Sequence, residues 1–106
     1  MLDYDIYLEN ILIAIKKIES SIKDRKDLDK EDLWDATLMR LQIIGENSRD
    51  IPREIKKRWK KFNWRGVLNL RNIISHKYQK VDKELIWKFI EDKLYLLKQI
   101  IEEELK

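Results

Sequence analysis

The chain has 106 residues with two glycines, one proline and no cysteine, and its formal net charge at pH 7 is +3. This length suits a single domain spanning residues 1–106, and the scarcity of turn-forming residues excludes an all-β fold. The lack of cysteine excludes a disulfide framework and a thiolate metal site. The acidic N-terminus is unlike a signal peptide and no apolar run approaches membrane-spanning length, so we expect a cytoplasmic protein without membrane association.

The first half of the chain predicts two amphipathic helices. Apolar residues recur at spacings of three and four over residues 4–24, and a second helix is predicted over 29–48 with Asp29 as its N-cap. The second helix has two apolar faces: Trp34, Leu38, Leu41 and Ile44 on one, and Ala36, Met39 and Ile43 on the other. A small monomeric bundle buries only one face of a helix, so the second face indicates a partner surface. Gly45 costs about 1 kcal/mol relative to alanine inside a helix, and we expect it to let another helix approach closely.

The second half predicts a short basic helix over 53–61, a helix over 64–76 capped by Asn63, and a last helix capped by Asp82. The expected core contacts of the 64–76 helix are Val67, Leu68, Ile73 and Ile74. The apolar stripe of the last helix is Leu85, Ile86, Phe89, Ile90, Leu94, Leu97, Ile100 and Ile101. Its tail, residues 102–104, is expected to fray into solvent. Four long helices with short connections predict an all-α fold, an antiparallel four-helix bundle with an extra short helix.

Positive charge is concentrated in residues 49–80, which hold 11 Lys and Arg residues against 2 acids, while the remainder holds 12 against 18. Such segregation favours a polyanion partner, nucleic acid or nucleotide. The candidate nucleic-acid-binding residues are Arg65, Lys77 and Lys80. A solvated helix face with incidental lysines is the alternative interpretation, and charge alone does not choose between the two.

The strongest candidate for a reactive site is the octet Arg71 to Tyr78, RNIISHKY, which holds the only histidine. Arg71 can hold a phosphate through bidentate hydrogen bonds, and His76 can remove or donate a proton when a ribose 2′-hydroxyl attacks. An offset of five helical residues separates them by about 140°, so they converge only if the helix ends near Ser75 or tightens, or if a second chain contributes. A two-fold dimer supplies His76 twice, as base and as acid. Asn72 and Ser75 can orient the imidazole or the phosphate.

A purely structural interpretation of the same residues is also open. A histidine near a helix C-terminus is stabilised by the macrodipole, and Arg71 can pair with Glu46 between helices. The four tryptophans are expected to be core or interface residues rather than nucleobase platforms, and the exceptions, if any, are expected at Trp59 and Trp64 because these two flank the basic stretch. The chain has no nucleotide-binding glycine loop, serine elbow or zinc spacing. An enzyme of this sequence is therefore expected to work without a cofactor or a protein-bound metal.

The octet also resembles a known motif. Arg71-x4-His76-x-Tyr78 resembles the R-x4-6-H-x-Y motif of the HEPN superfamily. The chain resembles the HepT branch of this superfamily at Ile44-Gly45-Glu46, at Trp64-x-Gly66, and at Val81-Asp82 with Trp87. The resemblance spans about residues 33–100. The chain departs from that pattern at Asn47, where the family usually has alanine, and at Ser75, where a small apolar residue is common.

The resemblance implies a helical homodimer whose two motifs meet in a basic cleft, and a toxin ribonuclease that cleaves RNA without metal. It implies that Arg71 and His76 are catalytic and that Asn72 supports them. It further implies a cognate antitoxin, a minimal nucleotidyltransferase of the MntA type, that transfers AMP to Tyr78. Added phosphate and adenine would fill the cleft and offset its positive charge.

Three hypotheses follow. The first is the dimeric toxin ribonuclease. The second is a non-catalytic nucleotide- or RNA-binding partner subunit of a nucleotidyltransferase, in which Arg71 and Lys77 grip phosphates. The third is a helical scaffold whose basic face only attracts polyanions, with binding that falls steeply with salt.

Overall fold

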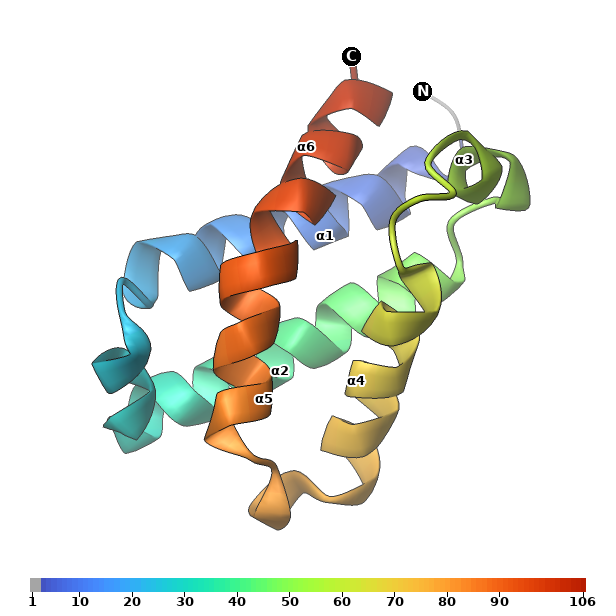
Figure 1. Ribbon diagram of the computed structural model, residues 1–106. Helices are drawn as coiled ribbons and strands as arrows, with labels where there is room; N and C mark the ends of the chain where they lie inside the picture. The colour runs from blue at the N-terminus through green and yellow to red at the C-terminus, as the bar shows by residue number, and fades with distance from the viewer. Residues whose placement is uncertain (1–2) are drawn as a thin grey trace.

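The computed structural model describes residues 3–106, and every regular element in that range is helical (Figure 1). The first half contains α1 (Asp5–Ser21), the 3-10 turn η1 (Arg25–Asp29) and α2 (Glu31–Arg49). Then come α3 (Arg53–Arg58), α4 (Trp64–His76) and the 3-10 turn η2 (Tyr78–Lys80). The last rod is made of α5 (Lys83–Phe89), the π-turn η3 (Ile90–Leu94) and α6 (Tyr95–Glu104). The prediction of an all-α fold is therefore confirmed for the residues described.

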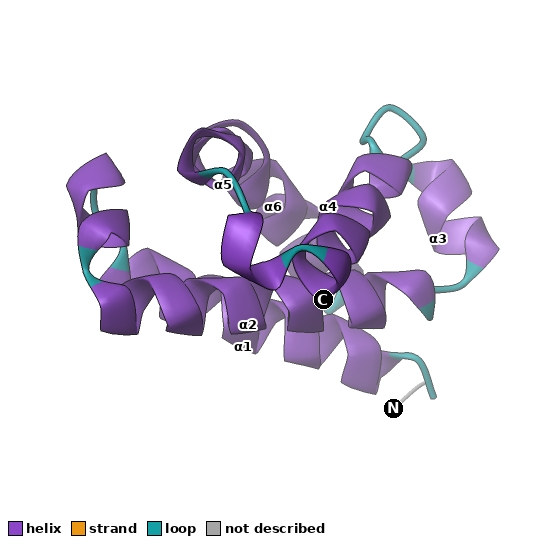
Figure 2. Ribbon diagram, turned by 90° about the horizontal axis from the view of Figure 1, so that it is seen from below, coloured by secondary structure: helices purple, strands orange, loops and turns teal. Residues whose placement is uncertain are grey.

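The helices form two pairs in two layers. α1 packs on α2, α2 packs on α4, and α1 packs on α6. Figure 2 shows α1 and α2 as one layer, with α4 and the α5–α6 rod covering it. In Figure 1 the second pair crosses the first pair steeply, so an antiparallel arrangement is not established for all four long helices. None of the helices in residues 3–106 combines the length and the apolar character needed to cross a bilayer.

The core lies between the two layers and follows the predicted stripe of α1. Leu8, Ile11, Ile15 and Ile18 are all fully buried, and full burial of such a side chain contributes roughly 1.5–3 kcal/mol. In α4 the buried residues are Val67, Leu70 and Ile74, at i, i+3 and i+7. Ile73, predicted as a core residue, is 37% exposed, because its neighbour Ile74 occupies the buried stripe and one residue turns the helix by 100°.

Two predicted N-caps are confirmed. The Asn63 side chain accepts a hydrogen bond from the backbone N–H of Gly66 at 2.9 Å at the start of α4. Asp82 likewise caps α5. The predicted cap of α2 is wrong: Lys30 stands at the N-cap without a side-chain bond, and Asp29 instead accepts a hydrogen bond from Lys83 at 3.0 Å. The Asp29 side chain, which local sequence predicts as a helix cap, is thus used in a contact with a distant segment of the chain.

The expected fraying at the end of the chain is also wrong at Glu104. Its carboxylate accepts hydrogen bonds from Arg58 Nη2 at 2.8 Å and from Trp59 Nε1 at 2.7 Å, and its side chain is only 10% exposed. The Arg58 hydrogen bonds hold the pKa of Glu104 below its usual value, and the indole adds to this effect. Glu104 therefore fastens α3 to α6, because charge-assisted hydrogen bonds are stronger than neutral ones.

Candidate functional site

Arg71 lies where α4 crosses α2 at Gly45. A Cβ atom added to Gly45 would stand 2.3 Å from Arg71 Cβ and 2.7 Å from Arg71 Cγ. These distances are far shorter than any ordinary carbon contact, so only glycine allows the two helices to approach this closely. The predicted role of Gly45 is confirmed, and the aliphatic stem of Arg71 is the group that it accommodates.

The guanidinium of Arg71 is oriented by two neighbours. Its Nη1 donates a hydrogen bond to Asn72 Oδ1 at 3.0 Å, and its Nη2 lies 3.5 Å from Glu46 Oε1. The Nε atom is buried and finds no acceptor in residues 3–106, and the side chain as a whole is 24% exposed. A ligand can therefore reach only the Nη end of this guanidinium, where it competes with Glu46.

His76 is the last residue of α4 and is exposed. The helix does not end before it, so the tightening that would swing His76 towards Arg71 does not occur within one chain. The five-residue offset leaves the two side chains about 140° apart around α4. Asn72 stands between these directions, since it accepts a hydrogen bond from Arg71 and lies one turn before His76 on the same face. Ser75 is exposed beside them.

Tyr78 follows in η2 and reaches back to α2. Its hydroxyl donates a long hydrogen bond of 3.4 Å to Asp35, and the residue is 45% exposed. Partial burial raises the pKa of Tyr78, and the charge and hydrogen bond of Asp35 add to the increase. The phenol is therefore protonated at neutral pH and accessible from solvent. No local pattern indicates Asp35 as a partner of Tyr78, because this contact joins residues 43 positions apart.

The predicted nucleic-acid-binding residues fall at two places. Lys77 and Lys80 are exposed beside Tyr78, whereas Arg65 is exposed in the first turn of α4. Eleven helical residues separate Arg65 from His76, or about 16 Å along the axis. The structure thus keeps the basic residues on one helix and its following turn but does not gather them into one cluster.

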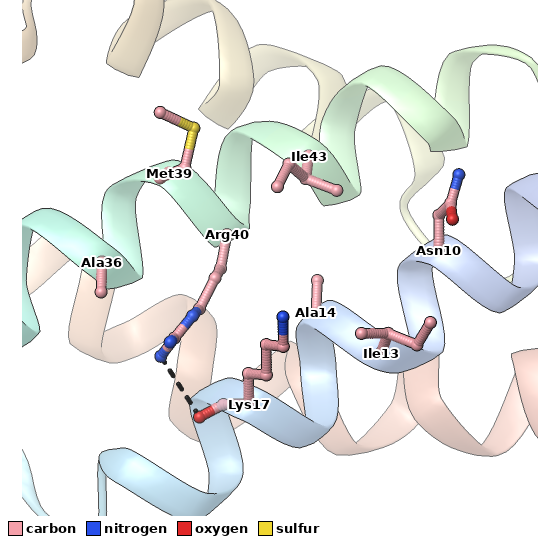
Figure 3. Close-up of a pocket in the computed structure, with 8 residues that line it drawn as sticks. All are labelled: Asn10, Ile13, Ala14, Lys17, Ala36, Met39, Arg40 and Ile43. Atoms are coloured by element: carbon pink, nitrogen blue, oxygen red, sulfur yellow. Dashed lines mark hydrogen bonds between the residues drawn. The ribbon is translucent and has the colours of Figure 1, made fainter.

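A groove between α1 and α2 exposes the second apolar face of α2. It has a volume of about 530 Å³ and is lined by Asn10, Ile13, Ala14, Lys17, Ala36, Met39, Arg40 and Ile43 (Figure 3). Met39 is 57% exposed and Ile13 is 53% exposed. The second face of α2 is thus exposed at Met39 and half-buried at Ala36 and Ile43, and Ile13 of α1 extends it.

Other candidate chemistry is limited in residues 3–106. No three His, Asp or Glu side chains in this range gather as a metal site would require. Trp59 and Trp64 are half-buried and donate their indole N–H groups within the protein, to Glu104 and to the carbonyl of Trp59 respectively. Both are structural anchors, so neither is the exception that its place beside the basic stretch suggested.

Comparison with known proteins identifies the class. The model of the family described as Ribonuclease HepT-like matches residues 11–104, so this helical chain belongs to the HepT-like family. The chain is 33% identical to the probable ribonuclease HepT of Thermococcus cleftensis, covering 87% of this chain and 86% of the relative. It is 29% identical to a putative RNase of Methanocaldococcus jannaschii, covering 94% of each.

A third relative is longer. The chain is 33% identical to a gamma-glutamylcyclotransferase and putative RNase of Methanocaldococcus jannaschii over 93% of this chain, but it spans only 46% of that protein. No solved structure matches the chain. The family and the names of these relatives indicate a ribonuclease type of activity.

Proposed function

We propose that this protein is a metal-independent endoribonuclease that works as a homodimer and is the toxin of a toxin–antitoxin pair. The observation that supports this most is the Nη end of Arg71, held by Asn72 one turn from an exposed His76. A fixed cation and an imidazole that can accept or donate a proton are the parts that cleavage through a ribose 2′-hydroxyl requires.

The chemistry assigns one step to each group. His76 takes the proton of the 2′-hydroxyl, the 2′-oxygen bonds to the adjacent phosphorus, and the bond from phosphorus to the 5′-oxygen breaks. The leaving oxygen needs a proton, which His76 of the partner subunit supplies. Arg71 stabilises the charge on the phosphate oxygens through its two Nη groups. The products are a 2′,3′-cyclic phosphate and a 5′-hydroxyl.

The dimer face follows from one stripe on α2. Asp35, Met39, Gln42 and Glu46 are spaced i, i+4, i+7 and i+11 and so share one side of the helix. Glu46 contacts Arg71 and Asp35 contacts Tyr78, while the exposed Met39 lies between them in sequence. A second copy seated on Met39 and the adjoining groove therefore lies against both ends of the motif. This arrangement compensates for the 140° that separates Arg71 and His76 within one chain.

The antitoxin in this proposal is a nucleotidyltransferase of the MntA type that transfers AMP to Tyr78. The phenol oxygen bonds to the α-phosphorus of ATP, pyrophosphate leaves, and Asp35 is placed to receive the phenol proton. The adduct brings a negative charge to a surface that also carries Lys77 and Lys80 and so opposes RNA binding. Mass spectrometry after incubation with ATP and such an enzyme should show AMP units on the wild type and none on Tyr78→Phe. Equal modification of both proteins would remove Tyr78 as the acceptor.

The decisive experiment is RNA cleavage by purified protein in EDTA. We expect His76→Ala to lower the rate by about 10² to 10⁴-fold, the usual contribution of acid–base catalysis. Lys16→Ala, an exposed change on α1, serves as the control and should keep the wild-type rate. Wild-type activity in His76→Ala and Arg71→Ala, or activity that EDTA abolishes, would refute the assignment.

The dimer is tested separately with Met39→Glu, which places a charge on the exposed face of α2. We expect this variant to sediment as a monomer, to keep its helical circular dichroism and to lose cleavage. Lys16→Glu on α1 is the matched control. A Met39→Glu protein that remains a dimer would show that the subunits meet elsewhere.

A further inference from the structure

A basic groove lies at the N-terminal end of α4, away from the proposed active site. Its volume is about 540 Å³, and its charged lining consists of Arg53, Lys56, Lys57, Lys60, Lys61 and Arg65. Figure 1 shows α3 beside the start of α4, while η2 lies at the opposite end of that helix. No acidic side chain lines this groove.

The six cations of the basic groove are not paired at close range within residues 3–106, although the charge of Asp50 acts on Lys56 and opposes the effect of burial on its pKa. None of them forms a salt bridge with a carboxylate in residues 3–106. Arg58, which lies on α3 among these cations, differs from them because it forms a salt bridge with Glu104 at 2.8 Å. The protein thus neutralises the cation that fastens α3 and leaves the surrounding ones available to an anion from outside.

One face of α4 connects the basic groove with the motif. Arg65, Asn69, Asn72 and His76 are spaced i, i+4, i+7 and i+11 along the helix and therefore share one side. Arg65, Asn69 and His76 are exposed and Asn72 is half-buried. The whole of α4 contains no acidic residue. The α4 stripe itself therefore offers a cation, two amides and an imidazole and no carboxylate, while Asp92 from η3 lines a hollow beside Asn69.

The aromatic residues of the basic groove are not free to stack on bases. Phe62 and Trp64 pack edge to face with ring centroids 5.0 Å apart, and the indole N–H of Trp64 donates to a backbone carbonyl at 3.1 Å. Side chains engaged in this way are poor platforms for bases, which need an open ring face. The groove therefore offers contacts to phosphates and few to bases.

We propose that the basic groove and the α4 stripe form a second binding site, which holds the phosphodiester backbone of single-stranded RNA beside the point of cleavage without reading its sequence. The inference rests on the proposed ribonuclease function for the identity of its ligand. From Arg65 to His76 the stripe covers about 16 Å, or about five nucleotides at the roughly 3.4 Å spacing of stacked nucleotides. RNA shorter than this cannot occupy the groove and the His76 end together.

The test uses binding of RNA that cannot be cleaved, so that its result does not depend on catalysis. Oligonucleotides methylated at every 2′-oxygen lack the attacking hydroxyl, and lengths of about 4 and about 16 nucleotides fall on either side of the span of the stripe. The groove variant is Lys57→Gln/Lys60→Gln/Lys61→Gln, which alters three exposed side chains. The matched control is Lys16→Gln/Lys23→Gln/Lys26→Gln, which removes the same charge from exposed positions on α1 and the α1–α2 connection.

For the longer oligonucleotide we expect the groove variant to bind at least about tenfold more weakly than the control at 0.1 M salt. Its plot of log affinity against log salt should be less steep by about 2, since each lost contact to a single strand removes about 0.7. Oligonucleotides of unlike sequence but equal length should bind the wild type within about threefold of one another.

Equal affinity and equal salt dependence in the two triple variants would overturn the proposal, as would a strong preference of the wild type for one sequence. Circular dichroism and thermal melting of both variants establish that each is folded. If the groove variant loses binding while no RNA is cut by the wild type, the binding site stands and the ribonuclease proposal fails. If cleavage depends on His76 but both triple variants bind RNA alike, the ribonuclease proposal stands and the second binding site is refuted.

Discussion

The two ends of α4 hold positive charge in opposite ways. At the C-terminal end one guanidinium, that of Arg71, is partly buried and kept in place by Gly45, Asn72 and Glu46. At the N-terminal end six cations surround an open groove and have no salt-bridge partner in residues 3–106. The first arrangement suits the orientation of one phosphate, and the second suits attraction of many. The exact position of the guanidinium matters at the C-terminal end of α4, and the total positive charge matters at the N-terminal end.

Conservative exchanges of cations should separate these two modes most clearly. Arg71→Lys keeps the charge but loses the two Nη donors, so we expect cleavage to fall by about a hundredfold, as when one donor to a transition state is removed. Arg53→Lys in the basic groove keeps the charge where only charge counts, and we expect RNA affinity to change by less than about threefold. Initial rates and binding isotherms provide the measurements. Similar effects of both exchanges would break the comparison.

Glycine substitutions should show the same contrast in stability. Gly45→Ala places a methyl group against the stem of Arg71, and we expect a loss of about 1–3 kcal/mol in unfolding free energy, typical of overpacking. Gly66→Ala meets only the side-chain amide of Asn63, at 2.7 Å. Loss of that cap costs about 1 kcal/mol and is offset by the better helix propensity of alanine. Urea unfolding should therefore rank Gly45→Ala well below Gly66→Ala, and the reverse order would contradict the close-approach argument.

The support of the basic groove can be weakened without altering the groove itself. Glu104→Ala releases Arg58 and Trp59, and we expect a loss of about 1–2 kcal/mol in unfolding free energy at pH 7. Glu103→Ala, which affects an exposed pair with Lys106, should cost less than about 0.5 kcal/mol. Thermal melting of both variants beside the wild type measures the difference.

The contribution of Glu104 should also depend on pH. Its pKa is lower in the folded protein than in the unfolded chain, where a glutamate titrates near about 4.3. The unfolded chain therefore takes up the proton first, so the stabilisation is complete above that pH and declines as pH falls through the folded pKa. The wild type and Glu104→Ala should become more alike in stability at acid pH. A constant difference down to pH 3 would exclude the carboxylate as the cause.

The smallest predicted effect concerns the phenol of Tyr78. Asp35→Asn removes the negative charge that faces the hydroxyl, so the pKa of Tyr78 should move down towards the ordinary value for tyrosine. NMR titration of tyrosine ring carbons follows this group, and Tyr78→Phe identifies its signal. Burial is the larger cause of the raised pKa and persists in the variant. A pKa that rises in Asp35→Asn would contradict the proposed contact.

Helical periodicity predicted local features well. The spans of the long helices, the caps at Asn63 and Asp82, and the close approach at Gly45 depend on short-range spacing or on backbone sterics. The pairing of Arg71 with Glu46 was one of two interpretations of Arg71, and the structure contains it. It does not decide the catalytic interpretation, because the Nη groups remain accessible.

Helical periodicity could not predict contacts between segments that are distant in the sequence. Tyr78 meets Asp35 across 43 positions, and Glu104 meets Trp59 across 45. Neither contact leaves a local pattern, since each depends on how one helix is rotated against another. The exposure of Ile73 has the same origin, because two adjacent isoleucines compete for one buried stripe. The basic groove was visible only as a surplus of charge, because its shape depends on how α3 lies beside the start of α4.

The crossing at Gly45 ties two properties of Arg71 together. Its carbon stem fills space between helices, while its nitrogen end is offered to a ligand. If the proposed toxin function holds, genetic selection for harmless variants should therefore recover substitutions at Gly45 as often as at the motif itself. Gly45, which has no side chain that could react, would then be one of the positions where a single mutation most often abolishes the activity.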